Sequence, residues 1–198
     1  MGSTRAAGRV VHDEQKKVLV AYYSATGSTK RVARYIVDAI GADEFELVPE
    51  VPYTHDDLAL RHVEVTCRVR REHDDARLRD VELKSAVAAK WDSYDAVFIG
   101  YPIWWGIAAW PVDAFIGANN FSGKTVIPFC THGGSGLGRS ADLLAEMAGS
   151  GNWLSGRPSD PGRVRAPCAS GCASLGCRFS RGADAGFCCG RPYLALYL

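Results

Sequence analysis

Short apolar runs alternate with helical patterns along the first three quarters of the chain. The run from Lys17 to Tyr23 is nearly continuously apolar, which is typical of a strand buried on both faces in a parallel sheet. Ser28 to Ile40 then places apolar residues at helical spacing, and Gly41 follows as a C-terminal cap. The segment from Glu44 to Val48 alternates and stops at Pro49, which favours a strand near a sheet edge.

The same alternation continues in the second half of this segment. It predicts in order a strand, a helix, a strand, a helix and a short last strand, at Ala96–Tyr101, Ile107–Ile116, Lys124–Cys130, Ser140–Ala148 and Asn152–Leu154. We expect Pro102 to end the first of these strands, and Pro128 to place the second at a sheet edge or a bulge. Alternating strands and helices predict a doubly wound α/β sheet, which binds ligands beyond the carboxyl ends of its strands.

The composition of the chain changes at Gly156. From there to Leu198 the sequence contains six Arg and five of the seven Cys, but no Lys, Glu or Ile. Gly and Pro are frequent in it, and no helical periodicity runs through it. We therefore divide the chain into a flexible N-terminus (1–16), one domain (17–155) and a tail (156–198) that is disordered or frameshifted. A complete domain would continue with a closing helix, which we expect this chain to lack.

The tail cysteines do not have the spacing of a structural zinc site. They lie at Cys168, Cys172, Cys177, Cys188 and Cys189. Zinc sites usually combine paired CxxC knuckles or a CxxC with histidines, and the tail contains neither. We expect no bound metal.

Charge and hydropathy limit the partners that the chain can have. The formal net charge is +1, which gives no global field to hold nucleic acid or an anionic membrane. The tail carries +4, so residues 1–155 carry −3 and form a mildly acidic domain. The N-terminus has no apolar core of a secretory signal, and the longest uncharged run, Ala96 to Val112, is interrupted by Pro and Gly. We expect a cytoplasmic protein without nucleic-acid or membrane partners.

The loop after the first predicted strand is rich in hydroxyl groups. It places four of them and one glycine at the start of a helix, where free backbone N–H groups and the helix dipole favour an anion. The pattern is neither GxxxxGK[ST] nor GxGxxG, so it favours a phosphomonoester over a nucleoside triphosphate or a dinucleotide. The alternative is a helix cap and turn without a ligand. The candidate phosphate ligands are Ser24, Thr26, Gly27, Ser28 and Thr29.

Two adjacent tryptophans follow the predicted strand that ends at Tyr101. Packing alone does not usually place indoles in a loop at the carboxyl end of a strand. We expect Trp104 to form a stacking surface for a planar heteroaromatic ring, and Trp105 and Trp110, each taken alone, to be buried packing. The candidate residues of this loop are Pro102, Ile103, Trp104, Trp105 and Gly106.

A third loop, Cys130 to Gly138, is small and flexible enough for backbone amides to approach a flat ligand. A phosphatase cradle would need C-x5-R, but the residue six after Cys130 is Gly136, so we interpret Cys130 as a buried thiol. His132 is either a ligand contact or an ordinary loop histidine. The candidate residues of this loop are Thr131, His132, Gly133 and Ser135.

Together the three loops resemble the flavin-binding loops of the flavodoxin family. Ser24 to Thr29 matches the family's [ST]-x-T-G-x-T phosphate signature, and Gly100–Gly106 and Phe129–Gly136 are similar to the second and third flavin loops of a bacterial flavodoxin-like subfamily. The resemblance covers about residues 17–155. It implies a parallel five-stranded sheet with strand order 2-1-3-4-5 and FMN at the topological switch point, an arrangement for which flavodoxin is the reference example.

The resemblance implies noncovalent FMN, with its phosphate on the first loop and its isoalloxazine against Trp104. Thr131 and Ser135 would hold the far edge of the ring, and Pro52–Tyr53 would lie near it. The segment Leu58–Asp80 lacks the Asn- and Ser-rich pattern expected of the family there, so its contribution stays open.

An FMN protein of this kind needs no acid or base from the protein, because the cofactor carries the chemistry. The leading interpretation is an electron-transfer protein that docks redox partner proteins, a reductase and an acceptor, through its acidic surface. The alternative is an FMN-dependent NAD(P)H:quinone oxidoreductase. A third interpretation is a flavin-free remnant that is unstable without its closing helix.

Overall fold

The computed structural model describes residues 16–58, 67–154 and 194–195. Five parallel strands form its centre, in the order β2-β1-β3-β5-β6. They are β1 (Val18–Tyr22), β2 (Asp43–Glu46), β3 (Ala96–Trp104), β5 (Thr125–Thr131) and β6 (Asn152–Trp153). Two short strands, β4 (Ile107–Ala108) and β7 (Leu194–Ala195), pair antiparallel with β3 and β5. Counted in chain order, the parallel strands have the order 2-1-3-4-5, which confirms the predicted doubly wound fold.

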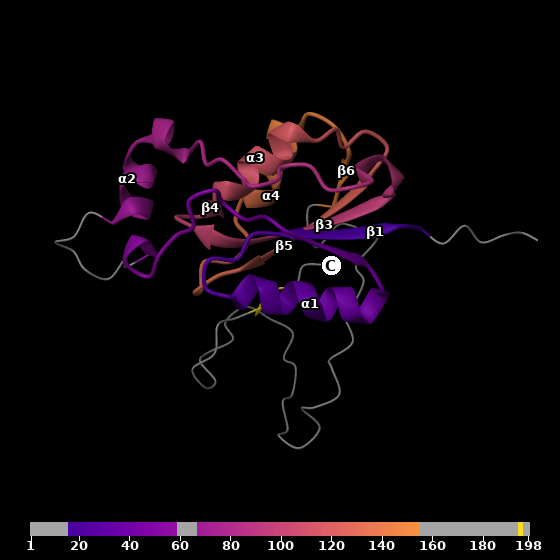
Figure 1. Ribbon diagram of the computed structural model, residues 1–198, viewed down its shortest axis with the longest axis horizontal. Helices are drawn as coiled ribbons and strands as arrows, with labels where there is room; N and C mark the ends of the chain where they lie inside the picture. The colour runs from indigo at the N-terminus through magenta and orange to yellow at the C-terminus, as the bar shows by residue number, and fades with distance from the viewer. Residues whose placement is uncertain (1–15, 59–66, 155–193, 196–198) are drawn as a thin grey trace, which may run out of the picture.

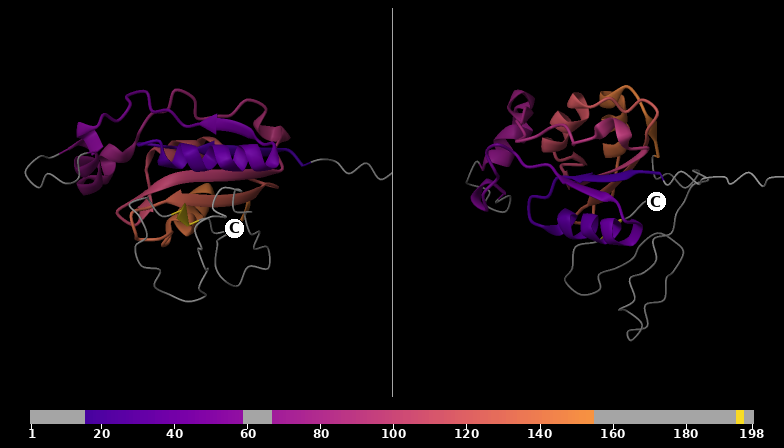
Figure 2. Two further views of the ribbon diagram at one scale, coloured as in Figure 1. Left: turned by 90° about the horizontal axis from the view of Figure 1, so that it is seen from below. Right: turned by 45° about the vertical axis from the view of Figure 1, so that its right-hand side comes forward.

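Helices cover both faces of this sheet. Helix α1 (Ser28–Ile40) lies on one face, and α3 (Pro111–Ala118) and α4 (Ser140–Ala148) lie on the other (Figures 1 and 2). Helix α2 (Arg68–Asp74) lies away from both faces, beyond the carboxyl ends of the strands and beside β4 (Figure 1). Three 3-10 turns complete the described elements, at Asp56–Leu58, Ala76–Arg79 and Trp91–Ser93.

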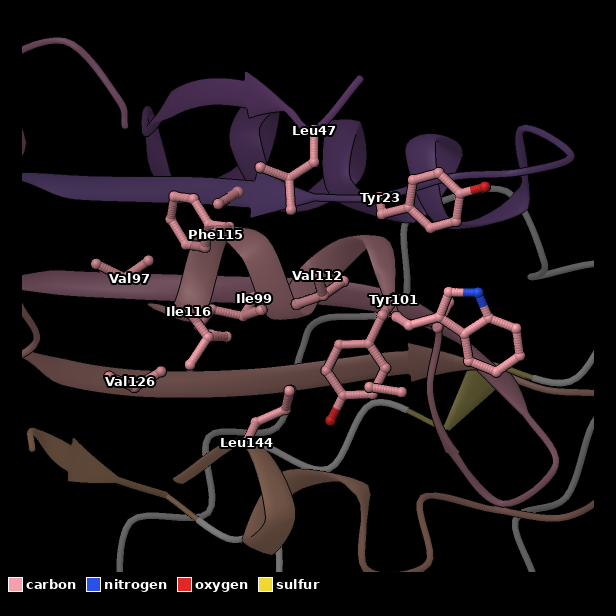
Figure 3. Close-up of a cluster of buried hydrophobic side chains, with 14 of the residues drawn as sticks. Tyr23, Leu47, Val97, Ile99, Tyr101, Val112, Phe115, Ile116, Val126 and Leu144 are labelled. Atoms are coloured by element: carbon pink, nitrogen blue, oxygen red, sulfur yellow. The ribbon is translucent and has the colours of Figure 1, made fainter. Parts of the chain in front are cut away.

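The main hydrophobic core lies between the sheet and the α3–α4 layer. Side chains from β3 and β5 meet apolar side chains of these two helices (Figure 3). Each of these residues is at most 2% exposed: Val97, Ile99, Val126, Val112, Phe115, Ile116 and Leu144. A smaller cluster packs α1 on the opposite face, with Tyr22 and Phe129 from the sheet against Val32 and Ala33. The inner strands β1, β3 and β5 are therefore largely buried, as their apolar runs indicated, whereas β2 at the sheet edge is not.

Helices α1 and α4 have the bounds that the sequence predicts. In α1 the stop signal works as expected: Gly41 has a φ of 67°, and its N–H donates to the carbonyl of Val37 over 2.8 Å. A left-handed residue of this kind ends a helix at little cost when it is glycine.

The helix predicted at Ile107–Ile116 is wrong in its first half. Strand β3 does not stop at Pro102 but continues to Trp104, turns, and pairs back through β4. Pro102 lacks an N–H, but its carbonyl accepts the N–H of Ala109 over 3.0 Å, so the pairing of β3 with the returning chain survives the proline. Helix α3 starts only at Pro111, because proline is favoured in the first turn of a helix.

Pro128 lies in an inner strand, which corrects the expectation of an edge or a bulge. It pairs in register with Ile99 of β3 on one side. On the other side, the carbonyl of Val126 accepts the N–H of Leu154. Backbone groups alternate in direction along a strand, so the backbone of Pro128, two residues later, faces the same side as that of Val126. Strand β6 ends at Trp153, where the next ladder bond would need the N–H that Pro128 lacks, so the proline lies at the end of the β5–β6 pairing.

Some predictions fall outside the described residues. These are the flexible N-terminus up to residue 15, most of the tail with its five cysteines and the frameshift, and the missing closing helix. The domain boundaries stay predictions for the same reason. Within the described ranges, no helix is both long and apolar enough to cross a membrane. The cytoplasmic location also stays a prediction.

Candidate functional site

The first loop leaves the N-terminus of α1 without a cap. Gly27 occupies the N-cap position with a φ of 83°, and within the described chain no side chain caps the helix and no acidic residue lies in its first turn. The hydrogen bond from the N–H of Arg31 to the carbonyl of Gly27, 3.1 Å, starts the helical ladder, so the preceding amides have no helical partner. Free amides at the positive end of a 13-residue helix form a site for an anion.

The hydroxyl groups of this loop have different surroundings. The Ser24 Oγ atom is buried and has no hydrogen-bond partner among the described residues, which points to a missing polar ligand. Thr26 and Gly27 are exposed, whereas Thr29 is buried and its Oγ1 lies 2.9 Å from Oγ1 of Thr131. The ammonium of Lys30 is paired with Glu46, so Lys30 does not add a free cation to this loop.

The second loop is a tight hairpin between β3 and β4. Trp105 and Gly106 form its two-residue turn, with φ values of 46° and 81°, and positive φ at both positions is the signature of a type I′ turn. Glycine adopts this conformation freely, but for tryptophan it costs of the order of 1–3 kcal/mol. Such strain persists only where surrounding contacts hold the residue in place.

The two adjacent indoles have exchanged the environments that we expected. Trp104 is only 8% exposed and makes edge contacts with three rings: Tyr23 at 5.7 Å, Tyr53 at 5.4 Å and Trp110 at 4.8 Å between centroids. Trp105 is 38% exposed and lies nearly parallel to Trp110, at 6.0 Å and 19°. We call these five rings the aromatic cluster. Trp104 is therefore core, and Trp105 presents the indole to solvent.

His132 in the third loop is held in one orientation. Its Nδ1 accepts the backbone N–H groups of Gly134 and Gly136, at 3.0 and 3.1 Å. A neutral imidazole whose Nδ1 accepts carries its proton on Nε2. The Nε2 atom is buried and has no partner among the residues described. His132 thus has a fixed hydrogen-bond donor that no described group uses.

The three loops meet at the carboxyl edge of the sheet. The Thr29–Thr131 hydrogen bond joins the first and third loops, and the Tyr23–Trp104 contact joins the first and second. The third loop also passes close to the hairpin, since a Cβ on Gly138 would lie 3.3 Å from the carbonyl oxygen of Gly106. Two candidate residues of the third loop, Gly133 and Ser135, are exposed to solvent.

Cys130 has the properties of a structural thiol. It is fully buried near the end of β5, and this burial raises the pKa of its thiol to about 12. A thiol with so high a pKa is protonated at neutral pH and is a poor nucleophile. This agrees with the interpretation from sequence.

A buried carboxylate beside the hairpin was not predicted from the sequence. Glu72 of α2 is 4% exposed and accepts hydrogen bonds from the Tyr53 hydroxyl, the Trp110 indole N–H and the Arg68 guanidinium, each over 2.7 Å. The Arg68–Glu72 spacing of four residues was a visible signal of an ion pair on a helix. The tryptophan partner is 38 residues away, and no local pattern reveals it.

A doubly wound parallel sheet with an anion site after its first strand and an aromatic hairpin after its third defines the flavodoxin-like class of α/β proteins. A family model described as Flavodoxin matches residues 17–161. The chain therefore belongs to the flavodoxin family.

Solved structures of similar proteins agree with this assignment. Candidate flavoproteins from Bacteroides eggerthii and Bacteroides uniformis are 41% and 36% identical to this chain, each with a TM-score of 0.63. These matches cover 70% of this chain and 84% and 86% of the two proteins. A Lactobacillus acidophilus flavoprotein, solved in complex with FMN, shares the fold at 24% identity and a TM-score of 0.51, over 70% of this chain and 90% of its own. No curated protein matches this chain.

Proposed function

We propose that this chain binds FMN noncovalently and carries electrons between redox partner proteins. One observation carries the proposal: the N-terminus of α1 and the buried Ser24 hydroxyl beside it have no side-chain partner among the described residues. A phosphomonoester would accept hydrogen bonds from both. The FMN that the Lactobacillus acidophilus protein binds on the same fold has such a phosphate.

The phosphate end of the site fits FMN. Backbone N–H groups at Gly27, Ser28 and Thr29 are the donors, supplemented by the hydroxyls of Ser24 and Thr26. Thr29 also braces the site through its hydrogen bond to Thr131. No cation is needed in the loop, because a helix N-terminus itself favours negative charge.

The ring end of the site fits a flat, partly polar heterocycle. The partly exposed indole of Trp105 offers an apolar contact to the ring, and the His132 Nε2–H offers a donor to a ring-edge acceptor. Thr131 and Ser135 are the proposed contacts at the far edge. Bound FMN would supply the one- or two-electron chemistry, so this chain has only to hold, stack and tune the ring.

Replacement of Ser24 tests the phosphate end. Ser24→Ala is expected to weaken FMN binding about tenfold, because a hydrogen bond to a charged group contributes about 1.5–3 kcal/mol. Ser122→Ala is the matched control, since Ser122 is exposed in a turn before β5. Titration with FMN, followed by flavin and tryptophan fluorescence, gives both affinities. Equal affinity of the two variants would contradict the assignment of Ser24.

A kinetic assay tests the electron carrier. The FMN-loaded protein alone is expected to show no sustained NADPH oxidation with a quinone, and to pass electrons only when a separate reductase is added. Docking through the acidic surface predicts that this transfer slows as ionic strength rises. Sustained turnover of NADPH and quinone by the isolated protein would assign an NAD(P)H:quinone oxidoreductase instead.

A further inference from the structure

Glu72 joins three segments that are distant in sequence. Its Oε2 accepts from Tyr53 and from Trp110, and its Oε1 accepts from Arg68 of its own helix. Burial and the carboxylate raise the pKa of the Tyr53 hydroxyl, which therefore stays protonated and donates. A buried carboxylate costs free energy unless such donors surround it, so this arrangement is tightly constrained.

Two of the three groups that donate to Glu72, Tyr53 and Trp110, belong to the aromatic cluster. Trp110 makes contacts with both tryptophans of the hairpin, at 4.8 Å to Trp104 and 6.0 Å to Trp105. Tyr53 contacts Trp104 and also Tyr23, which directly precedes the phosphate loop. Glu72 thus fixes two of the five rings through direct hydrogen bonds.

Helix α2 adds a second contact to the hairpin tip. His73, the neighbour of Glu72, stacks on Trp105 with 4.3 Å between ring centroids and 23° between planes. Arg79 donates to the backbone carbonyls of Glu72 and His73, at 3.0 and 2.7 Å, and its guanidinium lies 5.3 Å from the Trp110 ring. These contacts keep α2, which contributes nothing to the sheet, against the hairpin.

Trp105 needs such support, because it has the unfavourable left-handed conformation. The two rings that stack on it are Trp110 and His73. Glu72 holds the first by a hydrogen bond and anchors the helix that carries the second.

We propose that Glu72 is a positioning residue that acts through Trp110 and His73 to hold the partly exposed Trp105 indole in place beside the flavin. This inference rests on the proposed function for the identity of the ligand beside the indole. The arrangement of the indoles themselves does not depend on the flavin. The two parts can therefore be tested separately.

A matched pair of double variants tests the hydrogen-bond acceptor at position 72 separately from its charge. Arg68→Met/Glu72→Gln removes both charges but keeps a carbonyl oxygen that can accept from Trp110 and Tyr53. Arg68→Met/Glu72→Met removes both charges and the acceptor. Replacing a buried ion pair by apolar residues of similar volume is often neutral for stability, so both variants are expected to fold. Glu146→Gln, on exposed α4 surface, controls for the loss of a carboxylate.

The first readout uses the protein without flavin. The nearly parallel Trp105–Trp110 pair gives a near-ultraviolet circular dichroism signal, which we expect the Gln double variant to keep and the Met double variant to lose. Urea unfolding of each variant verifies that both are cooperatively folded. An unchanged signal in the folded Met double variant would overturn the positioning role, whether or not the chain binds FMN.

The second readout is FMN affinity in the presence and absence of the indole. The Met double variant is expected to bind FMN about tenfold more weakly than the Gln double variant. In a Trp105→Leu background this difference is expected to vanish, because the group that Glu72 positions is gone. A tenfold difference that persists without Trp105 would overturn the inference. Failure of the wild-type chain to bind FMN would overturn the proposed function instead and leave the first readout valid.

Discussion

His132 shows how a loop can fix the chemistry of one side chain. Two glycine amides donate to its Nδ1, so the proton of the neutral ring is on Nε2, which points to a partner outside the described residues. Glycines suit these positions because Gly134 and Gly136 both have positive φ, at 134° and 73°. The sequence left open whether His132 contacts a ligand, and its Nε2, which has no partner among the described residues, makes that contact testable.

Two substitutions of His132 separate its acceptor from its donor. Asn reaches the place of Nδ1 and can accept from the loop amides, whereas Gln reaches the place of Nε2 and can donate to the ligand. We expect His132→Asn to bind FMN about fivefold more weakly than His132→Gln, as measured by fluorescence titration. Affinity of the Asn variant equal to that of the wild type would show that Nε2 makes no contact with the cofactor.

Asp113 in the first turn of α3 gives the stability of the domain a pH dependence. Burial raises the pKa of this carboxyl to about 7, although the nearby Arg79 guanidinium opposes the shift. A raised native pKa means that ionisation is harder in the folded state, so the stability from this group is lost as the pH rises from about 4 through 7.

Asp113→Asn is therefore expected to stabilise the protein at pH 8 and to change little at pH 4. The expected gain at pH 8 is of the order of 2 kcal/mol in the free energy of unfolding. Urea unfolding at the two pH values measures it, with Asp92→Asn at an exposed position as the control. A gain of the same size at both pH values would rule out the titration of Asp113 as its cause.

At the scale of elements, the sequence predicted correctly those helices and strands whose ends are marked by a local residue pattern. Helix α1 was predicted to the residue, because apolar spacing and Gly41 define it. The hairpin was missed, because Pro102 suggested a strand end and the apolar run Ile107–Ile116 suggested a helix. Only the pairing of β3 with the returning chain decides between these, and pairing is a non-local property. The position of α2 was missed for the same reason.

Strand packing gives a prediction at this scale. A Cβ on Gly100 of β3 would lie 2.2 Å from the ring of Phe129 on β5, so Gly100→Ala forces this buried ring to move. We expect a loss of about 1–3 kcal/mol in the free energy of unfolding. Gly117→Ala in α3 is the matched control. No atom of the described residues lies within 4 Å of its Cβ position, and the helix is expected to gain about 0.5–1 kcal/mol. Equal stabilities in urea unfolding would contradict the close packing of β3 on β5.

At the scale of the whole molecule, the parallel sheet explains why three separate loops form one site. Parallel strands place their carboxyl ends at one edge, so the loops after β1, β3 and β5 converge without any sequence signal for their contacts. Their residue types were visible in the sequence, and the resemblance to flavodoxins suggested FMN as the ligand. Which of the two hairpin indoles is buried and which is exposed was not visible. It depends on contacts with Tyr53, Trp110 and α2, which are distant in sequence.

The most direct test of the central claim is a titration of the purified full chain with FMN, with the visible absorption spectrum and tryptophan fluorescence recorded together. We predict uptake of one FMN per chain, a perturbed flavin spectrum, and quenching of the tryptophan fluorescence by the flavin bound beside Trp105. Urea unfolding of the same sample verifies that it is folded. A cooperatively folded chain that takes up no FMN would contradict the account.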